Sequence, residues 1–174
     1  MSFAYGTPIA GPTGFKPVET YEVGDEALGA TMESEVPEWS PQDVAFSNGA
    51  PPGPAEFTMV YLAWGDGVAL TVTVDQSFLL IDGTLKCASY LAPGEHFVGA
   101  DGGTLTLERI EVGRFQGGVH AIALAPTEWN GTPDGHLLNA GGVVAGDYVA
   151  NQHAVEAAGA AEELSAPSGS IAYD

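Results

Sequence analysis

One short stretch, residues 71–80, limits what this chain of 174 residues can fold into. It alternates polar and apolar residues through Thr71-Val72-Thr73-Val74 and becomes continuously apolar after Ser77. Alternation with a period of two is typical of a strand with one buried face, and a short apolar run is typical of a fully buried strand. Because Asp75-Gln76 separates the two patterns, we predict two strands joined by a tight turn that directs polar side chains out of an apolar sheet.

The composition favours short strands joined by turns. The chain contains 24 Gly and 12 Pro, and 45% of its residues are hydrophobic. This length fits one domain that hides about 70% of its unfolded surface. We therefore predict an all-β domain over residues 1–150. Residues 33–54, which are rich in proline, should form an irregular surface insertion, and residues 151–174 a loose tail with at most a weak helix.

The net charge of the chain limits the kinds of partner that it can bind. The formal net charge is −19, with only four Lys and Arg residues. Such a field repels phosphate backbones and anionic lipids, so we expect neither nucleic-acid nor membrane binding. The acidity serves solubility or, alternatively, an acidic interaction surface. No apolar run approaches the roughly 18 residues that span a bilayer, and residues 1–14 have no basic start or apolar core of a signal peptide.

The remaining reactive side chains indicate no cofactor. Cys87 is the only cysteine, so no internal disulfide can form, and its position predicts a small core residue. His96, His120 and His153 lack the short spacings of metal-ligand pairs. We expect no metal, no cofactor and a monomeric chain.

Two segments of the chain carry distinctive residues at fixed spacing. The second is Thr73-Val74-Asp75-Gln76, and the first consists of Ser2, Phe3, Gly6, Thr7, Pro8, Ile9, Gly14, Lys16, Pro17, Val18, Glu19, Val23, Gly24 and Asp25. Together they resemble the Hint domains of inteins, bacterial intein-like proteins and Hedgehog autoprocessing domains. The opening block of that family is a nucleophile and an aromatic residue followed by a hairpin and a Val-Gly-Asp turn, and its central motif is Thr-x-x-His.

The resemblance implies a site at the Met1-Ser2 peptide bond. In the family, the first side chain attacks the preceding carbonyl to form an ester or thioester, which assigns the nucleophile to Ser2. Thr73 matches the motif threonine. Gln76 replaces the histidine and cannot shuttle a proton, so Asp75 and His136 are candidate substitutes. A histidine at position 76 should then restore proton transfer. Ser2 could instead be a polar residue without a role, or a replacement for cysteine.

The end of the module departs from the splicing pattern. His136 falls where the family places a late proton-transfer histidine, although a histidine bonded to the backbone at a strand end is the alternative. Splicing inteins finish in His-Asn, whereas this chain has Gly146-Asp147. The resemblance therefore implies no full splicing. It leaves N-terminal cleavage or transfer, with the flanking polypeptide in cis as the substrate.

An internal similarity supports a fold of two halves. Residues 23–30 parallel residues 93–100, although chance likeness of two turn-and-strand units is the alternative. The Hint resemblance implies a horseshoe-like or disk-like antiparallel fold with pseudo-twofold halves. Three hypotheses follow: an autoprocessing domain limited to its N-terminus, a catalytically decayed Hint fold that serves as a structural or binding module, and an acidic all-β surface protein without catalysis.

Overall fold

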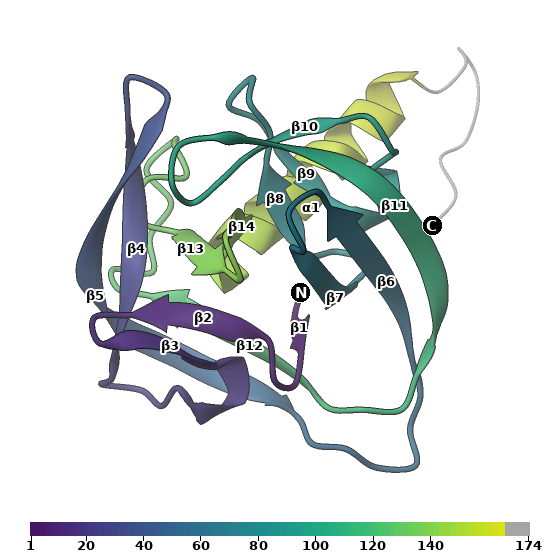
Figure 1. Ribbon diagram of the computed structural model, residues 1–174, viewed down its shortest axis with the longest axis horizontal. Coiled ribbons are helices and arrows are strands. Elements are labelled where there is room, and N and C mark those ends of the chain that lie inside the picture. The colour runs from purple at the N-terminus through teal and green to yellow at the C-terminus, as the bar shows by residue number, and fades with distance from the viewer. Residues whose placement is uncertain (166–174) are drawn as a thin grey trace.

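The structure is a computed structural model that describes residues 1–165, and it is built on one open antiparallel sheet (Figure 1). Strands account for 52% of the chain and helix for 12%, which confirms the predicted all-β class. The elements are β1 (Phe3–Ala4), β2 (Pro8–Gly11), β3 (Gly14–Pro17), the 3-10 turn η1 (Val18–Thr20), β4 (Glu26–Glu33), β5 (Val36–Ala50), β6 (Phe57–Trp64), β7 (Ala69–Thr73), β8 (Ser77–Leu79), β9 (Leu85–Cys87), the 3-10 turn η2 (Ala88–Tyr90), β10 (His96–Val98), β11 (Thr104–Phe115), β12 (Val119–Leu124), β13 (Leu137–Ala140), β14 (Val143–Gly146) and α1 (Tyr148–Ser165).

The sheet consists of two similar halves that exchange strands. Along the sheet the order is β10-β11-β6-β7-β1-β12-β5-β4-β13-β14-β8-β9, and β2 pairs with β13 and β3. The hairpin β4-β5 is followed by β6, and the hairpin β10-β11 is followed by β12. The long second strand of each hairpin pairs with the strand that follows the other one, β5 with β12 and β11 with β6. Because of this exchange, neither half can complete its sheet alone.

The repeat predicted from the sequence extends to individual hydrogen bonds. The turns η1 and η2 lie seventy residues apart, and each leads to a glycine with positive φ, 96° at Gly24 and 94° at Gly94. In each half a lysine pairs with the acidic residue after that glycine. These pairs are Lys16–Asp25 and Lys86–Glu95. The detailed agreement confirms the duplication.

Strand β1 lies between β7 and β12 and therefore joins the two halves. Phe3 pairs with Val72 on one side and with His120 on the other. Its ring is 1% exposed and belongs to the main core, together with Trp64, Phe78 and Phe97. The ring centroids of Trp64 and Phe97 are 5.3 Å apart in an edge-to-face arrangement, a geometry that adds specific attraction to apolar burial. The N-terminus is thus held near the middle of the sheet (Figure 1).

The expected irregular insertion at residues 33–54 is wrong over most of its length. Residues 36–43 of β5 pair with β4, and residues 44–50 pair with β12. The Val44 N–H donates to Asp25 O, directly before β4. Because backbone N–H groups alternate in direction along a strand, the nitrogens of Pro37 and Pro41 point to the opposite, unpaired edge of β5, where a missing N–H removes no hydrogen bond of the sheet. Trp39 and Phe46 contact the body of the protein as expected, through Ala100 O at 2.9 Å and through the Tyr148 ring. Between the start of β5 and the start of β6, the exposed loop is limited to residues 51–56.

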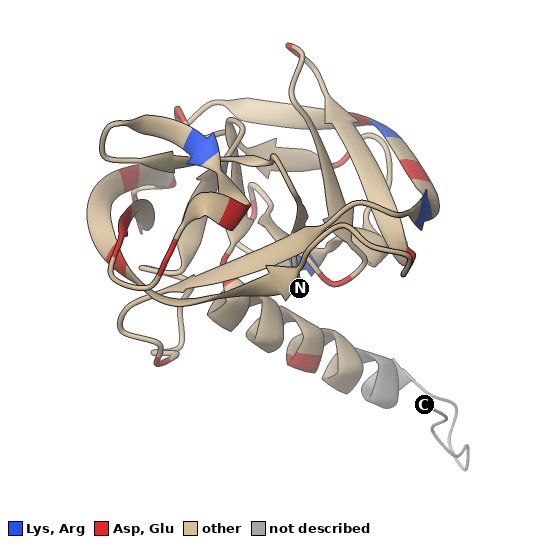
Figure 2. Ribbon diagram, turned by 90° about the horizontal axis from the view of Figure 1, so that it is seen from below, with Lys and Arg blue, Asp and Glu red and all other residues tan. Residues whose placement is uncertain are grey.

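Residues 151–165, expected as part of a loose tail, belong to helix α1 instead. Asp147 caps this helix, since its Oδ1 accepts the Ala150 N–H at 3.0 Å. Alanines favour the helix intrinsically, and Val149, Ala150 and Ala154 bury its first turns. Figure 2 shows α1 along one side of the sheet. Residues 166–174 lie outside the described part of the chain. No helix among the described residues is long and apolar enough to cross a membrane.

Candidate functional site at the N-terminal peptide bond

The Met1-Ser2 peptide bond lies at the end of β1, where it continues the sheet ladder. The Thr73 N–H donates to Ser2 O at 3.0 Å, so Ser2 stands opposite Thr73 on β7. Directly opposed residues of an antiparallel pair share a face of the sheet, so these two side chains lie on the same face, away from the core that holds Phe3. The strand pairing thus places Ser2 beside the threonine of the central motif, as the sequence predicted.

The Thr73 hydroxyl is the centre of a small polar network. It accepts the Ser2 N–H at 2.8 Å and a hydrogen from the Met1 amine at 2.8 Å. It donates to Asp75 Oδ1 at 2.7 Å, and the same carboxylate pairs with the Met1 amine. A hydroxyl offers one donor and two acceptor positions, so this arrangement uses all three. The nitrogen of the Met1-Ser2 peptide bond is therefore connected to a carboxylate through one hydroxyl.

The environment of Asp75 keeps it ionised in this state. Burial raises the pKa of the carboxyl group, but hydrogen bonds from the Met1 amine and from Thr73, with the amine's charge, lower the pKa below its usual value overall. Asp75 is thus a proton acceptor next to the Thr73 hydroxyl. A polypeptide joined to the Met1 nitrogen would remove the ammonium charge and raise this pKa.

Gln76 lies beside the site, but its side chain has no hydrogen bond to the Met1-Ser2 peptide group. The side chain is fully buried, and its Nε2 donates to Gly146 O at 2.8 Å and to Ser77 O at 3.0 Å. Its Oε1 accepts from Asn151 Nδ2 at 3.0 Å. The amide is therefore occupied by β14, β8 and α1 rather than by Met1 or Ser2, although the resemblance implies a place for Gln76 in the site.

Asn151 was missed by the sequence analysis. This side chain is 1% exposed, and its Nδ2 donates to Met1 O at 3.3 Å. Asn151 N donates to Asp147 O at 2.9 Å, so the first turn of α1 directs the side chain inward. The sequence signal that could have revealed it is Asp147, a residue type that often caps the start of a helix. In a helix that starts there, Asn151 is four residues further on and lies on the same side of the helix as Asp147.

His136 forms a separate buried pair with Asp147. Its Nδ1 lies 2.8 Å from Asp147 Oδ2, and its Nε2 lies 3.0 Å from Glu128 O. Both partners are acceptors, so both ring nitrogens carry hydrogens and the ring is an imidazolium. Burial lowers the pKa of His136, but the contacts with Asp147 and Glu128 raise it above the usual value overall.

The structure brings only part of the expected set together. Ser2, Thr73 and Asp75 form one network, whereas the Gln76 side chain bonds to Asn151, and the backbone N–H of Gln76 donates to Thr73 O at 3.1 Å. His136 has no hydrogen bond to any of these residues within the described part of the chain. The Ser2 hydroxyl likewise has no hydrogen-bond partner among residues 1–165, so no base is hydrogen-bonded to it in this state.

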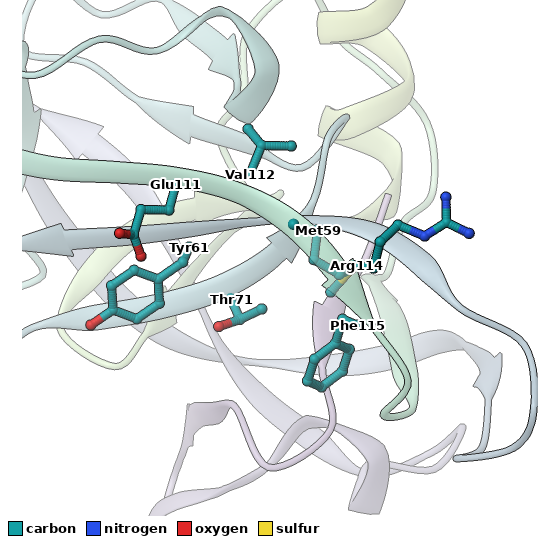
Figure 3. A pocket seen from close by; sticks show the side chains of 8 residues that line it. Met59, Tyr61, Thr71, Glu111, Val112, Arg114 and Phe115 are labelled. Carbon is teal, nitrogen blue, oxygen red and sulfur yellow. The ribbon is translucent and has the colours of Figure 1, made fainter.

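Other reactive groups nearby do not add a second site. Cys87 is buried, and burial followed by the charge of Asp75 raises the pKa of its thiol to about 11, so the thiol stays protonated at neutral pH. Within the described residues no three His, Cys, Asp or Glu side chains gather as metal ligands. A hollow of about 520 Å³ opens on β6, β7 and β11 and is shown in Figure 3. Its lining includes Met59, the strand partner of Thr73.

Comparisons with known proteins identify the fold. No family model and no curated protein matches the sequence. Among solved structures, a bacterial intein-like domain from Clostridium thermocellum is 19% identical with a TM-score of 0.68, and the match covers 84% of this chain and 98% of that one. The gp41-1 intein is 15% identical with a TM-score of 0.64 over 84% and 98% of the two chains. The MchDnaB-1 intein is 20% identical with a TM-score of 0.62 over 83% and 99%. The open sheet of exchanged halves around a central N-terminal strand is therefore the Hint fold shared by inteins and bacterial intein-like domains.

Proposed function

We propose that this chain is an autoprocessing domain that acts only at its N-terminal junction, by an acyl shift across the Met1-Ser2 bond followed by cleavage or transfer. The observation that carries the proposal is the hydrogen bond from Ser2 N–H to Thr73 Oγ1, with Asp75 next along the same chain of contacts. A leaving amine needs a proton, and this network ends on the nitrogen that must leave. The substrate is the polypeptide that precedes Ser2 in cis.

The proposed step rearranges one peptide bond. The Ser2 Oγ forms a bond to the Met1 carbonyl carbon, and the bond from that carbon to Ser2 N breaks. The hydroxyl proton leaves and one proton arrives on nitrogen, which becomes a free amine. Asp75 takes up the proton that the Ser2 hydroxyl loses, and the Thr73 hydroxyl, which lies between Asp75 and the nitrogen, then passes a proton from Asp75 to the leaving amine. Water then adds to the ester and releases a carboxylic acid and the Ser2 hydroxyl, or another nucleophile takes the acyl group.

Splicing chemistry is not part of the proposal. Asp147 occupies the end of the Hint module, and its carboxylate is engaged by His136, by the Leu124 N–H at 2.9 Å and by the Ala150 N–H. Its backbone carbonyl accepts the Asn151 N–H at 2.9 Å within α1. Cyclisation would require the side chain to give up three hydrogen bonds and the helix to lose its cap. The residues that would cut the C-terminal junction are thus used to hold α1.

A decayed Hint fold that serves as a structural or binding module is the second candidate. Two observations favour it: the Ser2 hydroxyl has no hydrogen-bonded base among the described residues, and the Gln76 side-chain amide donates to Ser77 O and Gly146 O instead of to the Met1-Ser2 peptide group. General acid–base assistance contributes about 10²–10⁴-fold to typical reactions. A site lacking it would cleave slowly or not at all.

A fusion experiment separates the two candidates. A stable partner protein joined directly before Met1 is followed by intact mass with and without hydroxylamine, which captures esters. We expect slow release of the partner from the parent sequence, faster release from Ser2→Cys because a thiol is partly ionised at neutral pH, and none from Ser2→Ala. If a folded Ser2→Cys fusion stays intact for days with hydroxylamine, autoprocessing is excluded and the module candidate holds.

A further inference from the structure

The carbonyl of the Met1-Ser2 bond has one side-chain donor in the described part of the chain, Asn151. The Nδ2-to-O distance is 3.3 Å, and the donor comes from α1, 150 residues along the chain. Met1 O is the atom on which negative charge would develop if Ser2 attacked its carbonyl carbon. The contact therefore lies on a reacting atom rather than at the edge of the site.

Neighbouring groups fix the orientation of the Asn151 amide. Its Oδ1 accepts from the Ser77 N–H at 2.8 Å and from the Ser77 hydroxyl at 2.6 Å. It also lies 3.2 Å from Gln76 Nε2. A backbone N–H can only donate, so the oxygen must face Ser77 and the nitrogen must face Gln76 Oε1 and Met1 O. Rotating the amide by 180° would place nitrogen against nitrogen.

We propose that Asn151 is a catalytic residue that polarises the Met1 carbonyl and stabilises the oxyanion of the acyl shift, while Gln76 and Ser77 act as positioning residues that hold it. This inference rests on the proposed autoprocessing function. Fixed donors aimed at a developing oxyanion are effective because they need no reorganisation during the reaction. Gln76, at the position of the motif histidine, then acts on the Met1 carbonyl indirectly, because its Oε1 holds the Asn151 amide that donates to Met1 O.

The packing at Gly146 supports a site built around this amide. A Cβ placed on Gly146 would lie 2.9 Å from the Ala150 Cβ, 3.1 Å from Asn151 Oδ1 and closer still to the Ser77 hydroxyl. The absence of a side chain there lets α1 approach β8 and β14 closely enough for Asn151 to reach Met1. Helix α1 is therefore part of the proposed reactive site.

The test uses the full chain carrying Ser2→Cys and an N-terminal fusion partner, so that cleavage is fast enough to measure. Asn151→Asp replaces the Nδ2 donor by an oxygen and keeps an acceptor for Ser77. Gln152→Glu makes the same amide-to-acid change at the exposed next residue and is the matched control. We expect Asn151→Asp to slow cleavage by about 10²–10³-fold, the usual cost of one oxyanion donor. The control should cleave at the parent rate.

The possible results are distinguishable. If the parent cleaves and a folded Asn151→Asp variant cleaves equally fast, the role of Asn151 is refuted and the autoprocessing proposal stands. If the Ser2→Cys parent does not cleave, both proposals fall together.

A second measurement covers the case in which Asn151→Asp does not fold. In the intact Ser2→Ala fusion with isotopic labels, NMR should show a coupling through the hydrogen bond between Asn151 Nδ2 and the Met1 carbonyl carbon. A well-resolved spectrum in which the Asn151 amide protons exchange freely and show no such coupling would refute the contact.

Discussion

Gln76 donates its side-chain amide to the backbone carbonyl of Gly146 at 2.8 Å, a contact that spans 70 residues of the chain. This contact ties the central turn to the last strand and to the start of α1. It explains why a residue in the motif position of a proton-transfer histidine serves here as a buried hydrogen-bonding residue.

The first prediction concerns Gln76→His, which the sequence alone suggested as a route to restored cleavage. The structure reverses that expectation. An imidazole has two ring nitrogens and cannot replace the contacts to Gly146, Ser77 and Asn151, and an unsatisfied buried polar group costs about 1–3 kcal/mol. We expect a lower free energy of unfolding and no faster release of a fused partner. Gln152→His, on the exposed face of α1, is the control. Faster cleavage at unchanged stability would show that the histidine can reach the bond.

Thr73→Val tests the polar network on the amide nitrogen. The substitution keeps the β-branched shape and removes the hydroxyl between Ser2 N and Asp75. In a Ser2→Cys fusion we expect cleavage to slow by about 10²-fold or more, since proton transfer typically contributes that much. The rate constant is measured by intact mass over time. Thr58→Val, at an exposed position on β6, should leave it unchanged. A Thr73→Val rate equal to that of the parent would remove Thr73 from the mechanism.

The pair of His136 and Asp147 predicts how stability depends on pH. The pKa of His136 is raised in the folded protein above its ordinary value of 6.5, so the folded state binds this proton more tightly than the unfolded state. The resulting stability is fully present below pH 6.5 and is lost as the pH rises through the folded pKa. Urea unfolding from pH 6 to pH 9 should show this decline. His136→Gln should abolish it, whereas His96→Gln, at an exposed site, should retain it. A parent protein with equal stability across this range would contradict the imidazolium assignment.

Gly146→Ala should damage both stability and cleavage. The added methyl group would come closer to the Ser77 hydroxyl and to the Ala150 Cβ than real Cβ atoms do, and it would also press on Asn151 Oδ1 at 3.1 Å, so α1 must shift. Overpacking of this kind costs about 1–3 kcal/mol. Thermal unfolding and fusion cleavage measure the two effects. Gly113→Ala is the control, because a Cβ there has no neighbour within 4 Å. A Gly146→Ala protein with parental melting would show that the helix tolerates displacement.

A deletion at the end of β5 and a deletion in the loop after it should differ strongly in their effect on stability. Deleting Asn48 to Pro52 would cost little if that region were irregular, but residues 48–50 pair with β12. We now expect this deletion to lower the melting temperature strongly. Deleting Pro52-Gly53-Pro54 shortens only the exposed loop, where length carries a small entropic cost, and should leave the melting temperature nearly unchanged. Equal effects from the two deletions would indicate that the end of β5 does not contribute to the fold.

The sequence by itself determined the elements whose signals are local. The alternation of polar and apolar residues predicts β7, and the polar pair Asp75-Gln76 between two apolar runs predicts the turn after it. The pair Asp66-Gly67 is typical of a hairpin turn, and it connects β6 to β7 with φ of 63° and 74°. The repeated turns at Gly24 and Gly94 also follow from local sequence. Motif resemblance then supplied Ser2 and Thr73 as neighbours, which strand pairing bears out.

Only the tertiary structure decided which groups face the Met1-Ser2 peptide bond. Proline suggested a loop where β5 forms a strand, because a free edge tolerates a missing N–H and no local pattern reveals which edges stay free. Low apolar content suggested a tail where α1 packs, because alanine buries little area per residue and leaves a weak hydrophobic pattern. Asn151 reaches Met1, and Gln76 turns towards Gly146, through contacts between residues far apart in the chain. Such contacts depend on how strands and helix pack in space, and residue spacing along the sequence does not encode them.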